Sequence, residues 1–280
     1  MRKRRFAMLI LSVLMASLIT PALAAPEDSG FALSDAGFNF IRSFEPFHAE
    51  PFEAGGRWYV GYGSACKPED YPRGITEEAA DALLLTALQT SVKSVNQYLS
   101  QQAITLEQYQ FDALVSFTYA LGSGWMSSSR LSDCLKTGLG NCQPAEIVSA
   151  VGIWCHANGK IVDRYLSRRM AEAVLLYYGD YSGARAADFV TLRLAPQGGK
   201  VISDVAFYMS GAPYGTLPVA TMDRYTFDGW HNAAGVRLTP EMLAINETVT
   251  ARWSASGTLS FQDVSAKDWF YPYVDDLYKS

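Results

Sequence analysis

The chain has 280 residues, 49% of them hydrophobic, so it can bury a sizeable core and has room for one ordinary domain plus a smaller unit. Its formal charge of −5 becomes −9 if residues 1–25, which hold four basic and no acidic residues, are removed. Such an acidic chain argues against nucleic acid as a partner, since phosphate binding needs a basic surface, and against simple electrostatic attachment to an anionic surface.

Residues 1–25 have the three parts of a signal peptide. Four basic residues precede an apolar stretch over 6–19, which is too short to form a stable bilayer-spanning helix, and an Ala-Leu-Ala triplet typical of a cleavage site follows at 22–24. We expect cleavage near Ala24 or Ala25 and therefore a secreted or cell-surface protein. An uncleaved membrane anchor is the alternative.

The next 150 residues are predicted to be mainly helical with one small β-hairpin. Apolar residues recur at helical spacing, acidic residues follow Thr76 at the start of a long helix, and Thr105 with Gln108 is typical of a capping box. In the hairpin, GGRWYVGYGS combines glycines with alternating aromatic and aliphatic residues. The expected elements are helices over 36–44, 76–99, 105–122, 128–135, 144–154 and 163–178, and a hairpin over 52–64.

The pattern changes after Asp180. Residues 182–186 are typical of a linker, and apolar and polar residues then alternate over 190–194 and again over 249–253. We therefore expect a small β-rich module over 187–253. A polar stretch and a short piece with helical spacing, together 254–280, complete the chain.

Four cysteines, Cys66, Cys134, Cys142 and Cys155, form an even set in a chain predicted to be exported. Of the three connectivities we favour Cys134–Cys142, which closes a short Gly-rich loop, and Cys66–Cys155, which ties an early segment to a late one. The spacings fit no metal motif, and adjacent Cys155 and His156 seldom face each other as nucleophile and base. We expect no metal and no cofactor.

Glu45 is the candidate for acid catalysis. Cleavage of a glycosidic bond needs a protonated carboxyl beside the leaving oxygen and usually a second carboxylate that activates water or attacks carbon. Glu45 follows the helix predicted over 36–44 and is flanked by Phe44, Pro46 and Phe47, and apolar neighbours favour the neutral form of a carboxyl.

The segments FIRSFEPF, WYVGYGS, GITEEAADALL, LEQYQFDALVSFTYALGSG, WCHANGK and SRRMAEA occur in order over about 34–180. They resemble the phage-type lysozymes and endolysins, glycoside hydrolase family 24. The resemblance implies a mainly α, two-lobed domain over 30–182 with a small hairpin lobe. It implies a monomeric muramidase that cleaves the β-1,4 bond between N-acetylmuramic acid and N-acetylglucosamine in peptidoglycan glycan strands. Glu45 matches the catalytic acid, and residues 61–63 match the hairpin motif that lines the cleft.

Two positions depart from the family pattern. The second acid aligns with Ala54, one residue after Glu53, and the threonine that commonly holds the water aligns with Tyr59. Adjacent residues of an extended strand point to opposite sides, so Glu53 replaces the acid only if the backbone shifts. Three mechanisms remain open: Glu53 as base in an inverting hydrolysis, with carboxyls about 6.5–9.5 Å apart; attack by a hydroxyl of the sugar with Glu45 as the single acid, as in lytic transglycosylases; or glycan binding without cleavage.

Other residues complete the predicted site. Trp58, Tyr59, Tyr62 and Gly63 are candidates for substrate binding, with packing as the alternative role for the aromatic rings. The resemblance places a paired-Arg motif at Arg168–Arg169, one of which would buttress the cleft near Glu45; a solvated helix face is the alternative. We assign Trp125 and Trp154 to the core.

The C-terminal part carries two further resemblances. APYGTLP, RYTFDGWHN and TARW are similar to an internalin-type B repeat, which implies a β-grasp-like module over 187–253. FQDVSAKDWFYPYVDDLY, within 254–280, is similar to the opening of an S-layer homology repeat and implies binding to secondary cell-wall polymers.

Overall fold

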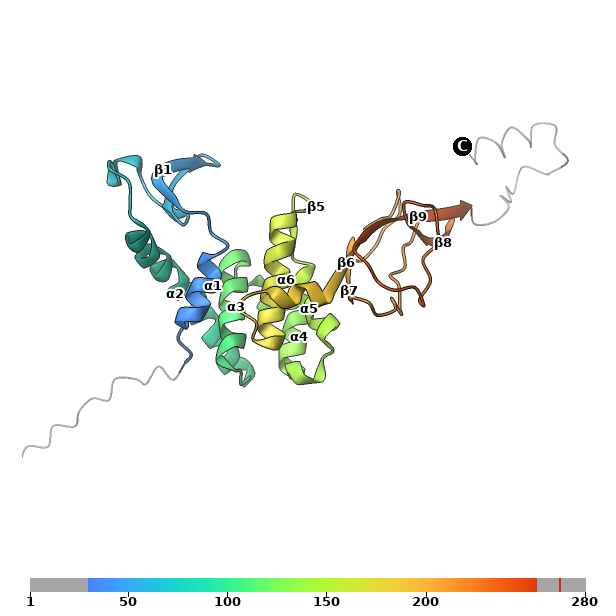
Figure 1. Cartoon of the computed structure of the whole chain (residues 1–280), viewed down its shortest axis with the longest axis horizontal. Helices are drawn as coiled ribbons and strands as arrows, with labels where there is room; N and C mark the ends of the chain where they lie inside the picture. The colour runs from blue at the N-terminus through green and yellow to red at the C-terminus, as the bar shows by residue number, and fades with distance from the viewer. Residues whose placement is uncertain (1–29, 256–266, 268–280) are drawn as a thin grey trace, which may run out of the picture. The chain divides into compact units, whose positions relative to one another are not determined.

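A computed structural model of the chain describes residues 30–255 and residue 267 (Figure 1). The predicted signal peptide and, apart from residue 267, the partial S-layer motif lie outside the described residues. The helices are α1 Asp35–Arg42, α2 Glu77–Gln102, α3 Gln108–Leu121, α4 Arg130–Thr137, α5 Pro144–Gly152 and α6 Asp163–Tyr178, with short 3-10 helices at Pro68–Asp70, Gly124–Met126, Leu139–Asn141 and Ala184–Asp188. The strands are β1 His48–Ala54, β2 Arg57–Gly61, β3 Ser64–Ala65, β4 His156–Ala157, β5 Lys160–Ile161, β6 Phe189–Ala195, β7 Val205–Met209, β8 Tyr225–His231 and β9 Glu247–Ala255.

Helix α1 is fixed at its N-terminus by the fully buried Asp112. The Ser34 hydroxyl accepts a hydrogen bond from Gly37 N at 3.0 Å, which caps the helix, and donates to Asp112 Oδ2 at 2.5 Å. The Tyr181 hydroxyl donates to the same oxygen at 2.6 Å. A Cβ at position 37 would lie 2.4 Å from Asp112 Cγ, so only glycine fits there. These contacts determine where the helix begins and hold it against α3, and Glu45 follows its other end, after Arg42.

The two long helices begin with different caps. Thr76 caps α2 as predicted, its hydroxyl accepting from Ala79 N at 3.2 Å. The capping box predicted at Thr105 was wrong by two residues, because Glu107 and Gln110 form it instead. Leu106 is buried just before the cap and packs in the core, which moves the first helical turn onward.

Helix α6 is the central element of the helical core and packs against both α3 and α5 (Figure 1). Its bounds are those predicted from the sequence. Trp125 is 1% exposed, as expected of a core residue, and Trp154 packs against the same core with its ring centroid 6.0 Å from that of Phe117.

The predicted hairpin is a three-stranded antiparallel sheet of order β1-β2-β3. Gly55 and Gly56 connect β1 to β2 with φ of +59° and +75°, the left-handed conformations that a two-residue hairpin turn requires. Gly61 also has a positive φ, and a Cβ there would lie 2.8 Å from the Cβ of Ala80. The GYG segment therefore needs its first glycine for close approach to α2.

The C-terminal module is a four-stranded sheet of order β7-β6-β9-β8, in which the neighbouring strands β6 and β9 run parallel (Figure 1). The segment predicted as a linker is partly ordered as the 3-10 helix Ala184–Asp188, with Arg185 stacked over the Tyr178 ring. Phe189, Val205 and Phe207 belong to the core of the helical domain, so the sheet packs directly on that domain.

None of the helices within the described residues combines the length and the hydropathy that a membrane crossing requires.

Candidate active site

Glu45 lies in the bend that follows α1 and is held by a residue of α6. Arg168 Nη1 donates to Glu45 Oε1 at 2.7 Å, and the two side chains are 11% and 19% exposed. The guanidinium also lies over the Phe44 ring, 5.2 Å from its centroid. Of the paired arginines, Arg168 therefore lies beside the proposed acid, as predicted for one of them.

Behind Arg168 lies a fully buried carboxylate, Glu172. It accepts from Arg168 Nε at 3.1 Å, Arg169 Nη2 at 2.8 Å and the Ser116 hydroxyl at 2.6 Å. Burial by itself lowers the pKa of Arg168, but the carboxylates of Glu172 and Glu45 outweigh it and the pKa is raised. Arg168 is therefore a permanent cation shared between a buried carboxylate and a half-buried one.

Arg168 orients the Glu45 carboxyl through a charge-assisted hydrogen bond, and Glu172 holds Arg168 from the other side. Glu172 therefore positions the proposed acid through Arg168. The sequence did not reveal this role, because Glu172 is one acidic residue among many until α6 and α3 are packed together.

Tyr119 of α3 is a second residue that the sequence analysis missed. Its pKa is raised by burial and then by the carboxylate of Glu45, while Arg168 opposes the shift. The phenol is therefore neutral and within electrostatic range of the proposed acid.

The residues around the missing second acid lie on both faces of the hairpin. Glu53 is exposed and pairs in register with Trp58, while Ala54 pairs with Arg57. Glu53 and Ala54 are neighbours in an extended strand and point to opposite faces. Among the described residues no hydrogen bond or ion pair joins Glu53 to Glu45.

The candidate sugar-binding residues differ in exposure. Trp58 is 40% exposed, whereas Tyr62 is 7% exposed and packs against Phe47 with ring centroids 5.5 Å apart. Tyr59 is half-buried with its ring 5.9 Å from that of Phe52. Gly63 has a positive φ and nothing within 4 Å of the position of a Cβ. The structure gives Tyr62 a packing role and leaves Trp58 as the most accessible ring of the three.

No disulfide joins the four cysteines in this structure, so neither predicted pairing is shown. Burial raises the pKa of Cys134 to about 12, and contact with Cys142 adds to the shift, so these two thiols lie together. Cys66 has Asp70 and Glu69 as its charged neighbours, whereas buried Cys155 contacts His156 Nδ1 at 3.8 Å. The Cys66–Cys155 pairing has no support in these surroundings.

The described residues contain no group of three His, Cys, Asp or Glu side chains placed to hold a metal ion.

Residues 42–172 match the model of the phage lysozyme family. The matched segment begins at the last residue of α1 and ends at Glu172, so it contains Glu45, the hairpin and the Arg168 cluster. The match supports a lysozyme-type domain in this part of the chain.

The endolysin of Bacillus phage B103 is 34% identical over 151 residues, which are 53% of this chain and 55% of that protein. The endolysin of Bacillus phage PZA is 32% identical over 150 residues, 52% of this chain and 55% of that protein. The chain thus spans about half the length of these curated relatives. The solved endolysin from Escherichia coli O157:H7 phage FAHEc1 is 29% identical over 54% of this chain and 96% of its own, with a TM-score of 0.45. The solved muramidase domain of SpmX from Asticaccaulis excentricus is 29% identical over 52% of this chain and 97% of its own, with a TM-score of 0.43.

Proposed function

We propose that residues 30–182 form a muramidase that cleaves the β-1,4 bond between N-acetylmuramic acid and N-acetylglucosamine in peptidoglycan, with Glu45 donating the proton to the leaving oxygen. The observation that carries this proposal is the position of Glu45, half-buried after α1 and oriented by Arg168 at 2.7 Å. The match of residues 42–172 to the phage lysozyme family supports it.

In the hydrolytic mechanism Glu53 acts as the base that activates water. Its exposure on β1 leaves it free to accept a proton from solvent-derived water. The bulge in β1, where the register with β2 shifts between His48 and Phe52, provides the backbone irregularity that would reorient the residues after it.

A second mechanism, lytic transglycosylation, is favoured by one observation. Ala54 stands where the family pattern has an acid, and Glu53 points to the opposite face of the strand. A single-acid reaction, in which a hydroxyl of the sugar attacks and Glu45 donates the proton, needs no second carboxylate.

The rest of the chain fits a role at the cell wall. We propose that residues 1–25 direct export, that Cys134 and Cys142 pair in the oxidising exterior, and that residues 187–280 attach the enzyme to secondary wall polymers. The proximity of the two thiols supports the disulfide. The parallel β6–β9 pair at the centre of the sheet supports a β-grasp-like B repeat. The alternative function is that of a wall-binding protein without hydrolytic activity, and a clearing assay distinguishes the two.

The test is the clearing of a suspension of purified peptidoglycan by the protein and by Glu45→Gln. We expect the wild-type protein to clear the suspension and Glu45→Gln to fold normally and leave it turbid. Sedimentation of protein with the wall and no clearing by either protein would replace the enzyme proposal with the wall-binding one.

A further inference from the structure

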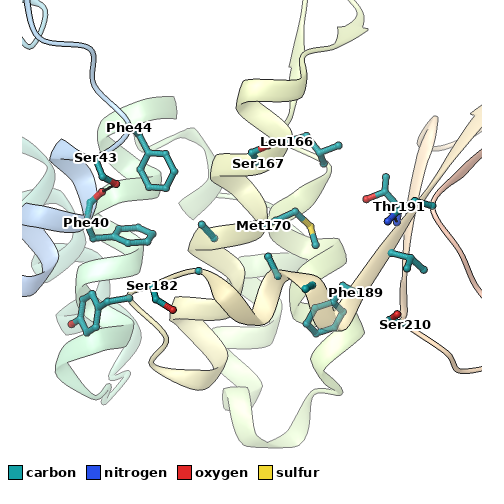
Figure 2. Close-up of a pocket in the computed structure, with 17 residues that line it drawn as sticks. Phe40, Ser43, Phe44, Leu166, Ser167, Met170, Ser182, Phe189, Thr191 and Ser210 are labelled. Carbon is teal, nitrogen blue, oxygen red and sulfur yellow. Dashed lines mark hydrogen bonds between the residues drawn. The ribbon is translucent and has the colours of Figure 1, made fainter.

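The structure contains a cavity of about 640 Å³ that is not part of the site around Glu45 (Figure 2). It lies over α6, whose Leu166, Ser167 and Met170 form part of its lining, and Phe40 and Phe44 bound it on the α1 side. The lining residues on the β6 side are Phe189, Val190, Thr191, Ser210 and Asn246. We call this cavity the seam trough, because the helical domain and the C-terminal sheet both contribute to it.

Several contacts outside the lining of the seam trough join the helical domain to the sheet. The Phe207 ring packs against Gly152 so closely that a Cβ there would lie 2.3 Å from it. His156 Nε2 lies 2.6 Å from Asp204 Oδ1. An ion pair between Arg193 of β6 and Asp163 of α6 joins the same two parts. The volume of the trough lies in the range of about 300–1,000 Å³ that small-molecule sites occupy.

The lining of the trough selects for an uncharged ligand. None of its 17 residues is an Asp, Glu, Lys, Arg or His. The phenol of Tyr181 stays neutral, because burial and its hydrogen bond to Asp112 raise its pKa to about 12. Phosphate-rich polymers and peptide stems carry charges that would lose hydration without gaining a partner.

The same lining offers both halves of saccharide recognition. The partly exposed rings of Phe44 and Tyr181 provide aromatic faces. Ser167, Thr191 and Ser210 provide hydroxyls, which both donate and accept (Figure 2). The Asn246 amide adds a further polar group, with its Oδ1 held by Thr191 N at 2.8 Å. An acyl chain would leave these polar groups without partners.

We propose that the seam trough binds a short, uncharged oligosaccharide, as a site separate from the one at Glu45. This inference stands on the trough itself and does not require that the protein cleave glycan. It assigns to the junction a binding role that neither the helical domain nor the sheet has alone.

The test uses Glu45→Gln protein, so that the probe is not cleaved, and chitotriose as the probe. The ¹³C-methyl signal of Met170 reports on the trough, and the indole ¹⁵N signal of Trp58 reports on the hairpin. We expect the Met170 signal to shift saturably with chitotriose. Filling the trough by Ser167→Trp or by Ser210→Trp, from opposite walls, should weaken that response at least about tenfold and leave the Trp58 response in place.

Ser100→Trp is the matched control, an exposed serine at the end of α2 outside the trough, and should change neither response. A Trp58 response without a Met170 response would overturn the inference and leave the proposed muramidase untouched. A Met170 shift with decanoate but not with chitotriose would overturn it in favour of an acyl ligand, and a response to neither probe would overturn it outright.

Discussion

Arg168 Nη1 lies 2.7 Å from Glu45 Oε1 although the two residues are 123 positions apart in the chain. The same guanidinium contacts buried Glu172 through Nε at 3.1 Å. One planar side chain thus links the end of α1 to the middle of α6, and the position of the proposed acid depends on it.

Arg168→Lys should therefore lower the catalytic rate more than it affects substrate affinity. An ammonium group is a point charge and does not hold both carboxylates in the geometry of the planar fork. We expect kcat for peptidoglycan to fall up to about 100-fold while KM changes little. Arg130→Lys, in the exposed pair with Glu146, is the control and should have no effect on either constant. A change confined to KM would mean that Arg168 serves binding alone.

Glu172→Gln should lower the stability of the helical domain. The variant leaves the guanidinium groups of Arg168 and Arg169 without their shared carboxylate at a fully buried position. Losing one partner from such a buried cluster costs about 3–5 kcal/mol of unfolding free energy. Denaturant unfolding measures this loss, and a variant as stable as the wild type would contradict the role given to Glu172.

Trp58→Ala should affect glycan binding, whereas Tyr62→Ala should affect stability. Trp58 is 40% exposed, so its loss should weaken glycan binding roughly two- to tenfold and leave stability nearly unchanged. Tyr62 is buried, so its loss should lower the free energy of unfolding by about 3–5 kcal/mol. Titration with chitotriose and denaturant unfolding measure the two effects, and a large loss of stability in Trp58→Ala would contradict the assignment.

Gly152→Ala should destabilise the junction between α5 and the sheet, because the new methyl group would meet the Phe207 ring. The expected loss of unfolding free energy is about 1–3 kcal/mol, and Phe207→Leu in the same chain should recover part of it. Gly140→Ala, where nothing lies within 4 Å, is the control. Equal stability of the Gly152 and Gly140 variants would show that the sheet does not pack there in solution.

The reduced protein should lose stability at alkaline pH. Burial raises the pKa of Cys155 from 9.0 to about 11, so the folded state keeps a proton that the unfolded state loses. The free energy of unfolding should therefore fall as pH rises from 9 to 11. Cys155→Ala should reduce this fall, although Cys134, whose pKa is raised to about 12, preserves part of it. Denaturant unfolding under reducing conditions measures both, and an identical fall in the variant would contradict the assignment to Cys155.

Much of the fold could be predicted from local patterns. The bounds of α6 and the cap of α2 at Thr76 follow from helical spacing and side-chain chemistry within a few residues. The start of α3 was predicted less accurately. Burial of Leu106 decides it, and burial depends on partners distant in sequence. The hairpin β4–β5 was missed because each of its strands has only two residues.

The candidate site was predicted in part. Glu45 and the paired arginines have recognisable neighbours in the sequence, whereas Glu172 and Tyr119 acquire their roles only when α3 and α6 meet. The seam trough could not be foreseen at all. It depends on how the sheet packs on α5 and α6, which no local pattern encodes.

The most direct test of the central claim is the mass of the soluble fragments that the wild-type and Glu45→Gln proteins release from purified peptidoglycan. We predict fragments with reducing ends from the wild-type protein and none from Glu45→Gln, and anhydro ends would assign the single-acid reaction to the same residue. Release of the same fragments at the same rate by both proteins would contradict the role of Glu45 as the proton donor.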